Sequence, residues 1–140
     1  MINEIYNRTE ILLGSDNIEK LKQSKVAILG LGGVGSYSLE ALARVGIGEI
    51  TIVDYDNVEK SNINRQISAL HSTLNRRKTE VSRDRIKDIN PGIKINVHNA
   101  FISKNNIKSL LNNDLDYAVD AIDTVSSKLD IITFCKENNI

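Results

Sequence analysis

The sequence is poor in the residues that cross-link or stiffen small proteins. It has no tryptophan, one proline and one cysteine, and aromatic residues make up only 4% of its 140 residues. The single Cys135 cannot form an internal disulfide and offers no Cys-x-x-Cys pair for zinc, which is typical of a protein in a reducing compartment. We therefore expect a cytoplasmic protein without structural disulfides or zinc.

Excess charge of one sign and long apolar runs are missing as well. Eighteen Lys plus Arg balance eighteen Asp plus Glu, so no net field favours a nucleic acid or a membrane. No stretch approaches the roughly 18 apolar residues of a membrane span, and the N-terminal stretch carries charges where a signal peptide needs an apolar core. We expect no membrane association, and the function has to be found in motifs.

The distribution of apolar residues predicts an α/β fold. Val26–Leu29 and Ile50–Val53 are short apolar runs, typical of strands buried on both faces of a parallel sheet. Between them, residues 34–45 have helical spacing, with Val34 and Leu39 on the apolar side, and glycines end the helix. This unit predicts a Rossmann-like, doubly wound, mainly parallel sheet with helices on both faces.

The rest of the chain continues the alternation of strands and helices. A helical lead-in is expected over 1–24, with a helix from Asp16 to Ser24 capped by Ser15 or Asp16. The nucleotide-binding domain is expected over 25–140. Its further elements are helices over 61–70, 79–89, 103–111 and from 125, an edge strand over 93–97 and a strand over 117–122. The last residues look like a helix followed by the start of another strand, so we expect the domain to be incomplete at its C-terminus.

A glycine motif lies directly between the first strand and the first long helix. Gly30, Gly32 and Gly35 form the pattern GxGxxG in the segment GLGGVG. Such glycines permit a tight turn, a close approach of backbone to phosphate, and packing of helix on strand. The start of the helix supplies N–H donors and the positive end of its dipole. The motif predicts a nucleotide phosphate site.

Polar residues downstream indicate a ligand with more charge than a dinucleotide. Asp54 ends the second strand nineteen residues after Gly35, where an acid binds ribose hydroxyls. The segments DYD and SNINRQ follow it, and DAID ends the last predicted strand. A site that cleaves a triphosphate needs cations and usually magnesium. Arg65, Lys78 and Asp123 would meet that need.

Together, these segments resemble a known family. GLGGVGS, ALARVGIGEITIVDYD, SNINRQ, DINPGIKI and YAVDAIDTVSSK occur in the order found in the ThiF/MoeB and ubiquitin-activating E1-like superfamily of adenylating enzymes. RTEILLG, RIKDINP and the extension of the last segment to DAIDTVSSKLDII resemble its tRNA threonylcarbamoyladenosine dehydratase branch most. The resemblance implies an ATP-binding domain and covers nearly the whole chain.

The resemblance also implies roles for individual residues. Glycines 30, 32, 33 and 35 would line the phosphates. Asp54 would bind the ribose, and Asp56 would support that loop. The nucleotide would also be surrounded by the polar segment, with Arg65 and Lys78 neutralising charge and Asp123 binding Mg²⁺. The members of that segment are Asn62, Asn64, Arg65 and Gln66.

The same resemblance implies a reaction and partners. A substrate carboxylate would attack the α-phosphorus of ATP, and in the dehydratase branch that carboxylate belongs to N6-threonylcarbamoyladenosine in tRNA, which is then cyclised by net dehydration. Arg8 matches an arginine that reaches into the neighbouring subunit's site in dimeric relatives, so a homodimer is implied. Sulfur-transfer proteins are further possible partners.

Three alternatives remain open on the sequence. One is adenylation of the C-terminal glycine of a ubiquitin-like sulfur-carrier protein. A second is an NAD-dependent oxidoreductase, which rests on GxGxxG and Asp54 alone. A third is a chain that keeps a nucleotide or dimer surface without turnover. The basic stretch 76–87 is interpreted as a solvated helix face apart from Lys78, since acids are interspersed in it.

Overall fold

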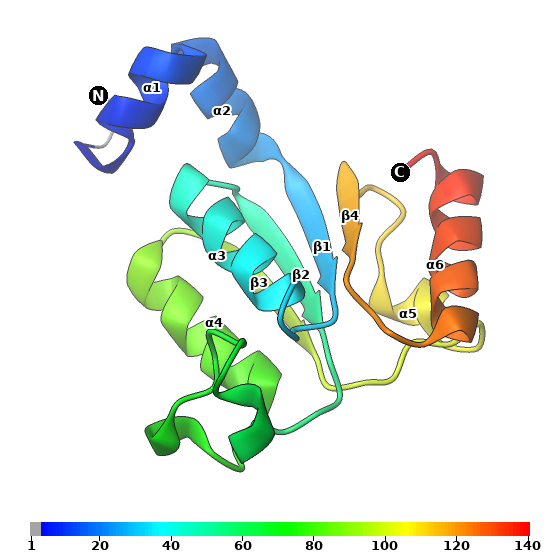
Figure 1. Ribbon diagram of the computed structural model, residues 1–140. Helices are drawn as coiled ribbons and strands as arrows, with labels where there is room; N and C mark the ends of the chain where they lie inside the picture. The colour runs from blue at the N-terminus through cyan, green and yellow to red at the C-terminus, as the bar shows by residue number, and fades with distance from the viewer. Residues whose placement is uncertain (1–3) are drawn as a thin grey trace.

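The centre of the molecule is a four-stranded parallel sheet. The computed structural model describes residues 4–140, and Figure 1 shows the strands side by side in the order β3-β2-β1-β4. Their bounds are β1 Lys25–Leu29, β2 Glu49–Val53, β3 Lys94–His98 and β4 Tyr117–Asp120. All three pairings are parallel. The predicted α/β fold with a parallel sheet is confirmed, and the strand order reverses between β1 and β4, where open sheets of this kind bind ligands.

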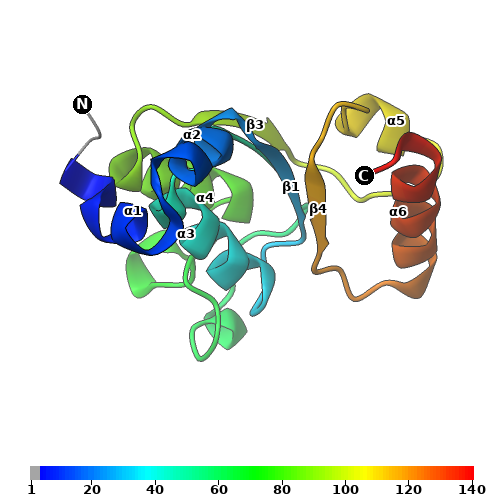
Figure 2. The same ribbon diagram turned by 90° about the horizontal axis from the view of Figure 1, so that it is seen from above.

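Helices cover both faces of this sheet. Figure 2 shows α3 (Gly35–Val45) and α4 (Lys78–Ile89) on one side, and α5 (Ile107–Leu110) and α6 (Val125–Asn138) on the other. Along β1 the side chains alternate between two apolar clusters. Ile28 packs with Leu39 and Ile86, whereas Leu29 packs with Ile131. The central strands are therefore buried on both faces, as their continuous apolar runs predict.

The N-terminal helices lie beyond the amino end of β1 (Figure 1). A short 3₁₀-helix, Glu4–Tyr6, leads into α1 (Asn7–Leu13), and α2 is Ser15–Gln23. The predicted cap of α2 is wrong, because Gly14 is the N-cap residue and no side chain caps this helix. Helix α1 was not expected, since it buries none of its residues and so lacks the apolar stripe that predicts a helix.

Two predicted helices are largely replaced by turns. Residues 61–70 form no α-helix: the first two end a 3₁₀-helix, Lys60–Asn62, the others form turns, and a second 3₁₀-helix, His71–Thr73, follows. Side chains compete with the helical pattern here, since Asn62 Oδ1 accepts a bond from the Glu59 N–H at 2.9 Å. Likewise, residues 103–106 form a turn in which Asn106 Oδ1 accepts from the Ser103 N–H at 2.9 Å, and only α5 is helical.

One predicted core residue is exposed. Val34 is the N-cap residue of α3, and 68% of it is exposed. No helix within residues 4–140 combines the length and apolar character that crossing a membrane requires.

Candidate functional site

The glycine motif forms a tight turn between β1 and α3. Gly30 has φ +93°, and a Cβ there would lie 2.5 Å from the carbonyl oxygen of Ala121, in the segment after β4. A Cβ on Gly35 would lie only 1.7 Å from the carbonyl oxygen of Gly30. Backbone therefore packs directly on backbone at this turn, which brings the start of α3 against the carboxyl ends of β1 and β4.

Several backbone donors at this turn are not used by the protein itself. Within residues 4–140 the N–H groups of Gly32, Gly33 and Val34 make no hydrogen bond, whereas Gly30 and Leu31 donate to Val53 O and Asp54. Helix α3 is 11 residues long, so its first turn also carries the positive end of a helix dipole. Unused N–H groups at a helix start are a binding site for an anion such as phosphate.

A cavity of about 250 Å³ opens beside the turn. Its volume is near the low end of ligand pockets, which begin at roughly 300 Å³. It lies at the carboxyl ends of all four strands, the edge at the bottom of Figure 1. The residues that line it are Gly30, Gly32, Val53, Asp54, Tyr55, Asp56, Asn62, Arg65, Gln66, Lys78, Ala100, Phe101, Ile102, Ala121, Ile122, Asp123, Thr124 and Ser127.

Asp54 ties the glycine turn to the end of β2. Its Oδ2 accepts a bond from the Leu31 N–H at 2.7 Å, and its Oδ1 accepts from the Asp56 N–H at 2.8 Å. Each carboxylate oxygen has a second lone pair. The carboxylate can therefore hold the turn and still accept a hydrogen bond from a hydroxyl in the cavity.

The cavity contains a buried cation. Lys78 is the first residue of α4 and is 5% exposed. Its Nζ lies 3.4 Å from Asp56 Oδ2, on a carboxylate that is 48% exposed. This long ion pair leaves donors of the ammonium group available, because Nζ has three and makes no other hydrogen bond in the described chain. Folding has already removed the Lys78 ammonium group from water, and Asp56 compensates part of that cost. An anionic ligand in the cavity would therefore find a cation that is already desolvated.

The segment SNINRQ lies beside the glycine turn, since a Cβ on Gly33 would be 3.5 Å from Arg65 Cδ and one on Gly32 would be 3.7 Å from Gln66 Nε2. Gln66 is 7% exposed, and its Oε1 has no hydrogen-bond partner within residues 4–140. A buried, unsatisfied amide oxygen costs about 1–3 kcal/mol, so it points to a donor that is not part of this chain. Arg65 is exposed and is held at the rim by Nη1 bonds to Ser61 O at 2.9 Å and Asn64 Oδ1 at 3.0 Å.

The two aspartates of DAID differ in their partners. Asp120 accepts bonds from Lys128 Nζ at 3.1 Å and from the Ile122 N–H at 3.2 Å. Asp123 lines the cavity, is exposed, and has no hydrogen bond or ion pair within the described residues. Asp123 is thus the carboxylate on this side of the cavity that is available to a ligand.

Some residues expected at the site do not line the cavity. Gly33 and Gly35 are not among the lining residues, although they belong to the turn and helix start beside the cavity. The Asn64 side chain is exposed and bonds to Arg65. Arg8 is in α1, beyond the amino ends of the strands, at the opposite end of the sheet (Figure 1). The structure therefore brings together Asp54, Asp56, Asn62, Arg65, Gln66, Lys78 and Asp123 with two of the four glycines.

The aromatic part of the cavity was missed on the sequence. Tyr55 and Phe101 line it, and their rings meet edge to face with centroids 5.3 Å apart. Tyr55 is 53% exposed and Phe101 is 44% exposed. Phe101 follows the edge strand β3. Its position just after a predicted strand could have indicated that it lies at the carboxyl edge of the sheet, near the cavity.

Cys135 shows no sign of an activated thiol, and no metal-binding group is found around it or the histidines in residues 4–140. Burial raises the pKa of the Cys135 thiol, and the charge of Asp120 raises it further. The thiol is therefore protonated near neutral pH and packs beside the apolar cluster of α5 and α6. Within residues 4–140, no three His, Cys, Asp or Glu side chains form a metal-binding group.

Comparisons with known proteins agree with this geometry. The model of the ThiF family matches residues 6–140. Over 125 residues the chain is 46% identical to the tRNA threonylcarbamoyladenosine dehydratase of Haemophilus influenzae, and the match covers 89% of this chain and 48% of that protein. The molybdopterin-synthase adenylyltransferase of the same organism is 34% identical over 137 residues, which are 96% of this chain and 56% of that protein.

A solved structure matches the whole chain. The crystal structure of Escherichia coli tRNA N6-threonylcarbamoyladenosine dehydratase, TcdA, in complex with ATP superposes with a TM-score of 0.94 at 36% identity, covering 100% of this chain and 59% of that one. The chain spans about half the length of the curated relatives it matches.

Proposed function

The chain belongs to the ThiF family, and from this premise we propose that it is the ATP-binding part of an enzyme that adenylates a carboxylate of tRNA-bound N6-threonylcarbamoyladenosine, which cyclises with net loss of water. The observation that carries the proposal is the cavity at the β1–α3 turn. It combines unused backbone N–H groups, the buried cation Lys78 and the unpaired carboxylate of Asp123. An oxidoreductase acting on NAD would not need the last two groups.

The residues of the cavity fit ATP in a definite arrangement. The phosphates would lie against the N–H groups of residues 32–34, with Lys78 and Arg65 opposing their charge. Asp54 would accept a hydrogen bond from the ribose. The orphaned Oε1 of Gln66 would accept from a ligand hydroxyl or an ordered water.

Asp123 fits Mg²⁺ as a single carboxylate ligand. Mg²⁺ in nucleotide sites is held by one or two carboxylates together with phosphate oxygens and water, so a larger acidic cluster is not needed. When bound, the ion would stabilise the charge that develops on the phosphates.

The chemistry requires positioning and charge stabilisation rather than a nucleophile from the protein. A carboxylate oxygen of the substrate attacks the α-phosphorus of ATP, and the bond to pyrophosphate breaks. Lys78 and Arg65 would stabilise the negative charge that accumulates on the leaving pyrophosphate. The protonated Cys135, half-buried against the apolar cluster, takes no part.

Arg8 would act in a second copy of the chain. Its helix lies at the end of the sheet away from the cavity (Figure 1), so it does not complete the site of its own chain. A homodimer in which Arg8 of each subunit enters the other's site is therefore part of the proposal.

Exchange of labelled pyrophosphate into ATP by the full-length protein tests the function. We expect exchange that depends on tRNA carrying N6-threonylcarbamoyladenosine and that falls in Arg65→Ala and Asp123→Asn. Exchange that depends instead on a protein ending in two glycines would identify a sulfur-carrier adenylyltransferase. A rise in melting temperature with NAD, but none with Mg-ATP, would overturn adenylation altogether.

A further inference from the structure

The basic residues of this protein form two very different surfaces. The sequence shows its most obvious basic stretch around α4, and in the structure three of its arginines pair with acids. Arg76 and Arg83 both pair with Asp84, each at 2.8 Å, and Arg85 Nε lies 2.6 Å from Glu40 Oε2 on α3. These arginines are therefore held in ion pairs, which limits their freedom to reach a phosphate.

The second surface is the segment 101–108, which follows β3 and forms α5. Lys104 and Lys108 are exposed, and within residues 4–140 neither has an ion-pair partner. No acidic residue occurs between Asn99 and Asn113. The nearby Asp114 and Asp120 are already engaged by Lys25 and Lys128. This segment therefore carries two uncompensated positive charges in a chain with no net charge.

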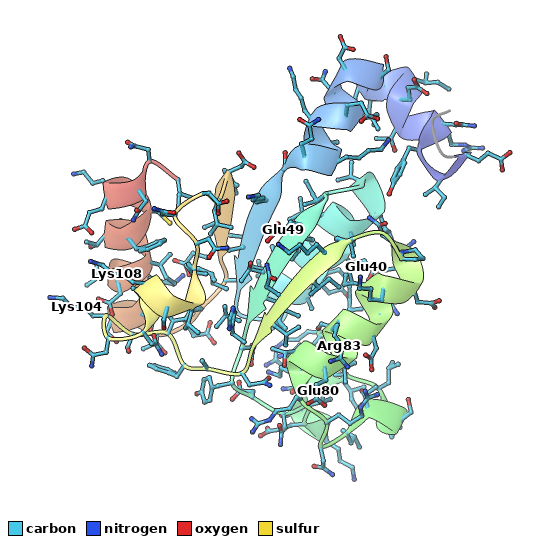
Figure 3. The ribbon with its side chains drawn as sticks, turned by 180° about the vertical axis from the view of Figure 1, so that it is seen from behind. Glu40, Glu49, Glu80, Arg83, Lys104 and Lys108 are labelled. Atoms are coloured by element: carbon cyan, nitrogen blue, oxygen red, sulfur yellow. The ribbon has the colours of Figure 1, made fainter. Side chains whose placement is uncertain are left out.

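The position of this segment connects it to the cavity. Phe101 and Ile102 line the cavity, and Ile102 O accepts a bond from the buried Ser127 Oγ at 2.7 Å, which fixes the segment against α6. Lys104 follows Ile102 by two residues, a span of at most roughly 7 Å along the backbone. Figure 3 shows Lys104 and Lys108 on one flank of the molecule, with Glu40, Glu80 and Arg83 on the other flank.

We propose that Lys104 and Lys108 contact backbone phosphates of the tRNA substrate, which approaches the cavity over Phe101 rather than along α4. This inference rests on the proposed function and extends it to the path of the substrate. Unpaired, flexible lysines are suited to phosphate contacts that fix position without reading sequence. Phe101 lines the cavity, is 44% exposed and precedes Lys104 by three residues, so an unpaired base can stack on its ring.

Salt dependence of tRNA binding tests the proposal. In the full-length protein, we expect Lys104→Ala/Lys108→Ala to reduce the slope of log K against log salt by about 1.4–1.8, since each phosphate contact contributes roughly 0.7–0.9. The ratio of the affinity at 50 mM salt to that at 200 mM should be about tenfold smaller in this variant than in the wild type. Lys104→Arg/Lys108→Arg should restore both quantities, because charge rather than shape is needed.

Two control variants test whether other basic surfaces, on α2 and α4, contribute to the slope. Lys20→Ala removes an exposed cation in α2, at the far end of the sheet, and Arg83→Ala/Arg85→Ala removes two paired cations of α4. Both should leave the slope within about 0.4 of wild type, a bound set at half of one phosphate contact. An unchanged slope in the lysine variant, or an equal loss in the α4 variant, would overturn the proposed path.

Failure of the path and failure of the function give different results. Mg-ATP binding, followed by melting temperature, should be the same in wild type and in the lysine variants, since neither lysine lines the cavity. Wild-type protein that binds tRNA while the lysine variant keeps the full slope refutes only the path. Wild-type protein that binds Mg-ATP but no tRNA refutes both the path and the tRNA substrate.

Discussion

The two ends of the central sheet use their polar side chains in opposite ways. At the amino ends of the strands, charged side chains pair with one another. Lys25 pairs with Asp114, and Lys94 Nζ lies 3.1 Å from Glu49 Oε1. At the carboxyl ends, Asp123 and the amide oxygen of Gln66 have no partner within residues 4–140, and the buried Lys78 makes one long contact. At the carboxyl ends Asp120 and Asp54 also bond within the fold, but unpaired polar groups remain beside them, which the amino-end pairs just described do not leave.

Glycine-to-alanine substitutions at the two ends should give the largest effect. A Cβ on Gly35 would lie 1.7 Å from Gly30 O, and a Cβ on Gly48, at the amino end, would lie 1.8 Å from Lys22 O. Because backbone must move in both cases, we expect each substitution to cost about 3 kcal/mol or more of unfolding free energy in urea titrations.

Ligand binding should then distinguish the two variants. Mg-ATP should still raise the stability of Gly48→Ala but not that of Gly35→Ala, since only Gly35 belongs to the glycine turn where the phosphates are proposed to bind. Gly92→Ala is the matched control, because the nearest atom to its added Cβ is the Asn90 side chain at 3.7 Å. Equal responses of Gly35→Ala and Gly48→Ala to Mg-ATP would contradict the division between the ends.

Removing one lysine at each end of the sheet should give the next largest difference, measured as the rate of pyrophosphate exchange. We expect Lys78→Met to lower pyrophosphate exchange by about 100-fold to 1,000-fold, the size of effect seen when one preorganised donor is removed from a charged transition state. Lys25→Met should change exchange by less than about twofold, because exposed ion pairs contribute little. Lys78→Arg tests whether charge alone suffices. If both methionine variants exchanged pyrophosphate equally slowly, Lys78 would be needed for the fold rather than for the reaction.

The smallest expected effect is on the unfolding free energy at acid pH, and it comes from an ion pair outside the cavity. The Arg85 hydrogen bond, opposed by burial and helped by Arg44, holds the pKa of Glu40 below its ordinary value of 4.5. A lowered pKa in the folded state contributes stability above about pH 4.5 that is lost as the pH falls through the lowered value. Glu40→Gln should therefore cost less than about 1 kcal/mol at pH 7 and should flatten the loss of stability between pH 5 and pH 3.

Urea titrations over this pH range measure the effect, with the Mg-ATP response at pH 7 as the control. That response should be unchanged, since Glu40 is remote from the cavity lining. A variant with the same pH dependence as the wild type would show that the α3–α4 ion pairs are not the acid-sensitive contacts.

Much of the fold was predictable because its elements are local patterns. The apolar runs of β1 and β2, the alternation of β3 and the glycines before α3 all predict the elements that the structure has. The errors occur where side chains bond to nearby backbone. Asn62 and Asn106 replace two expected helices by turns, and a single-residue capping bond is invisible to periodicity.

The candidate site was partly predictable for a different reason. Asp54 and Asp123 lie in motifs that follow predicted strands, Lys78 was proposed as a cation for the phosphates, and all three line one cavity in the structure. Tyr55 and Phe101 were missed, because their ring contact joins two segments that no motif connects. The roles assigned to all these residues stay predictions until the variants are measured.

The sequence by itself determined the four strands, the helices α3, α4 and α6 that alternate with them, the glycine turn and the identity of the polar residues near it, since each depends on neighbours along the chain. Only the tertiary structure decided which charges remain available. Arg85 is paired with Glu40, 45 residues away, whereas Lys104 and Lys108 have no ion-pair partner in the described part of the chain. A charge acts through its distance to every other charge in space, and that distance is set by packing rather than by position in the sequence.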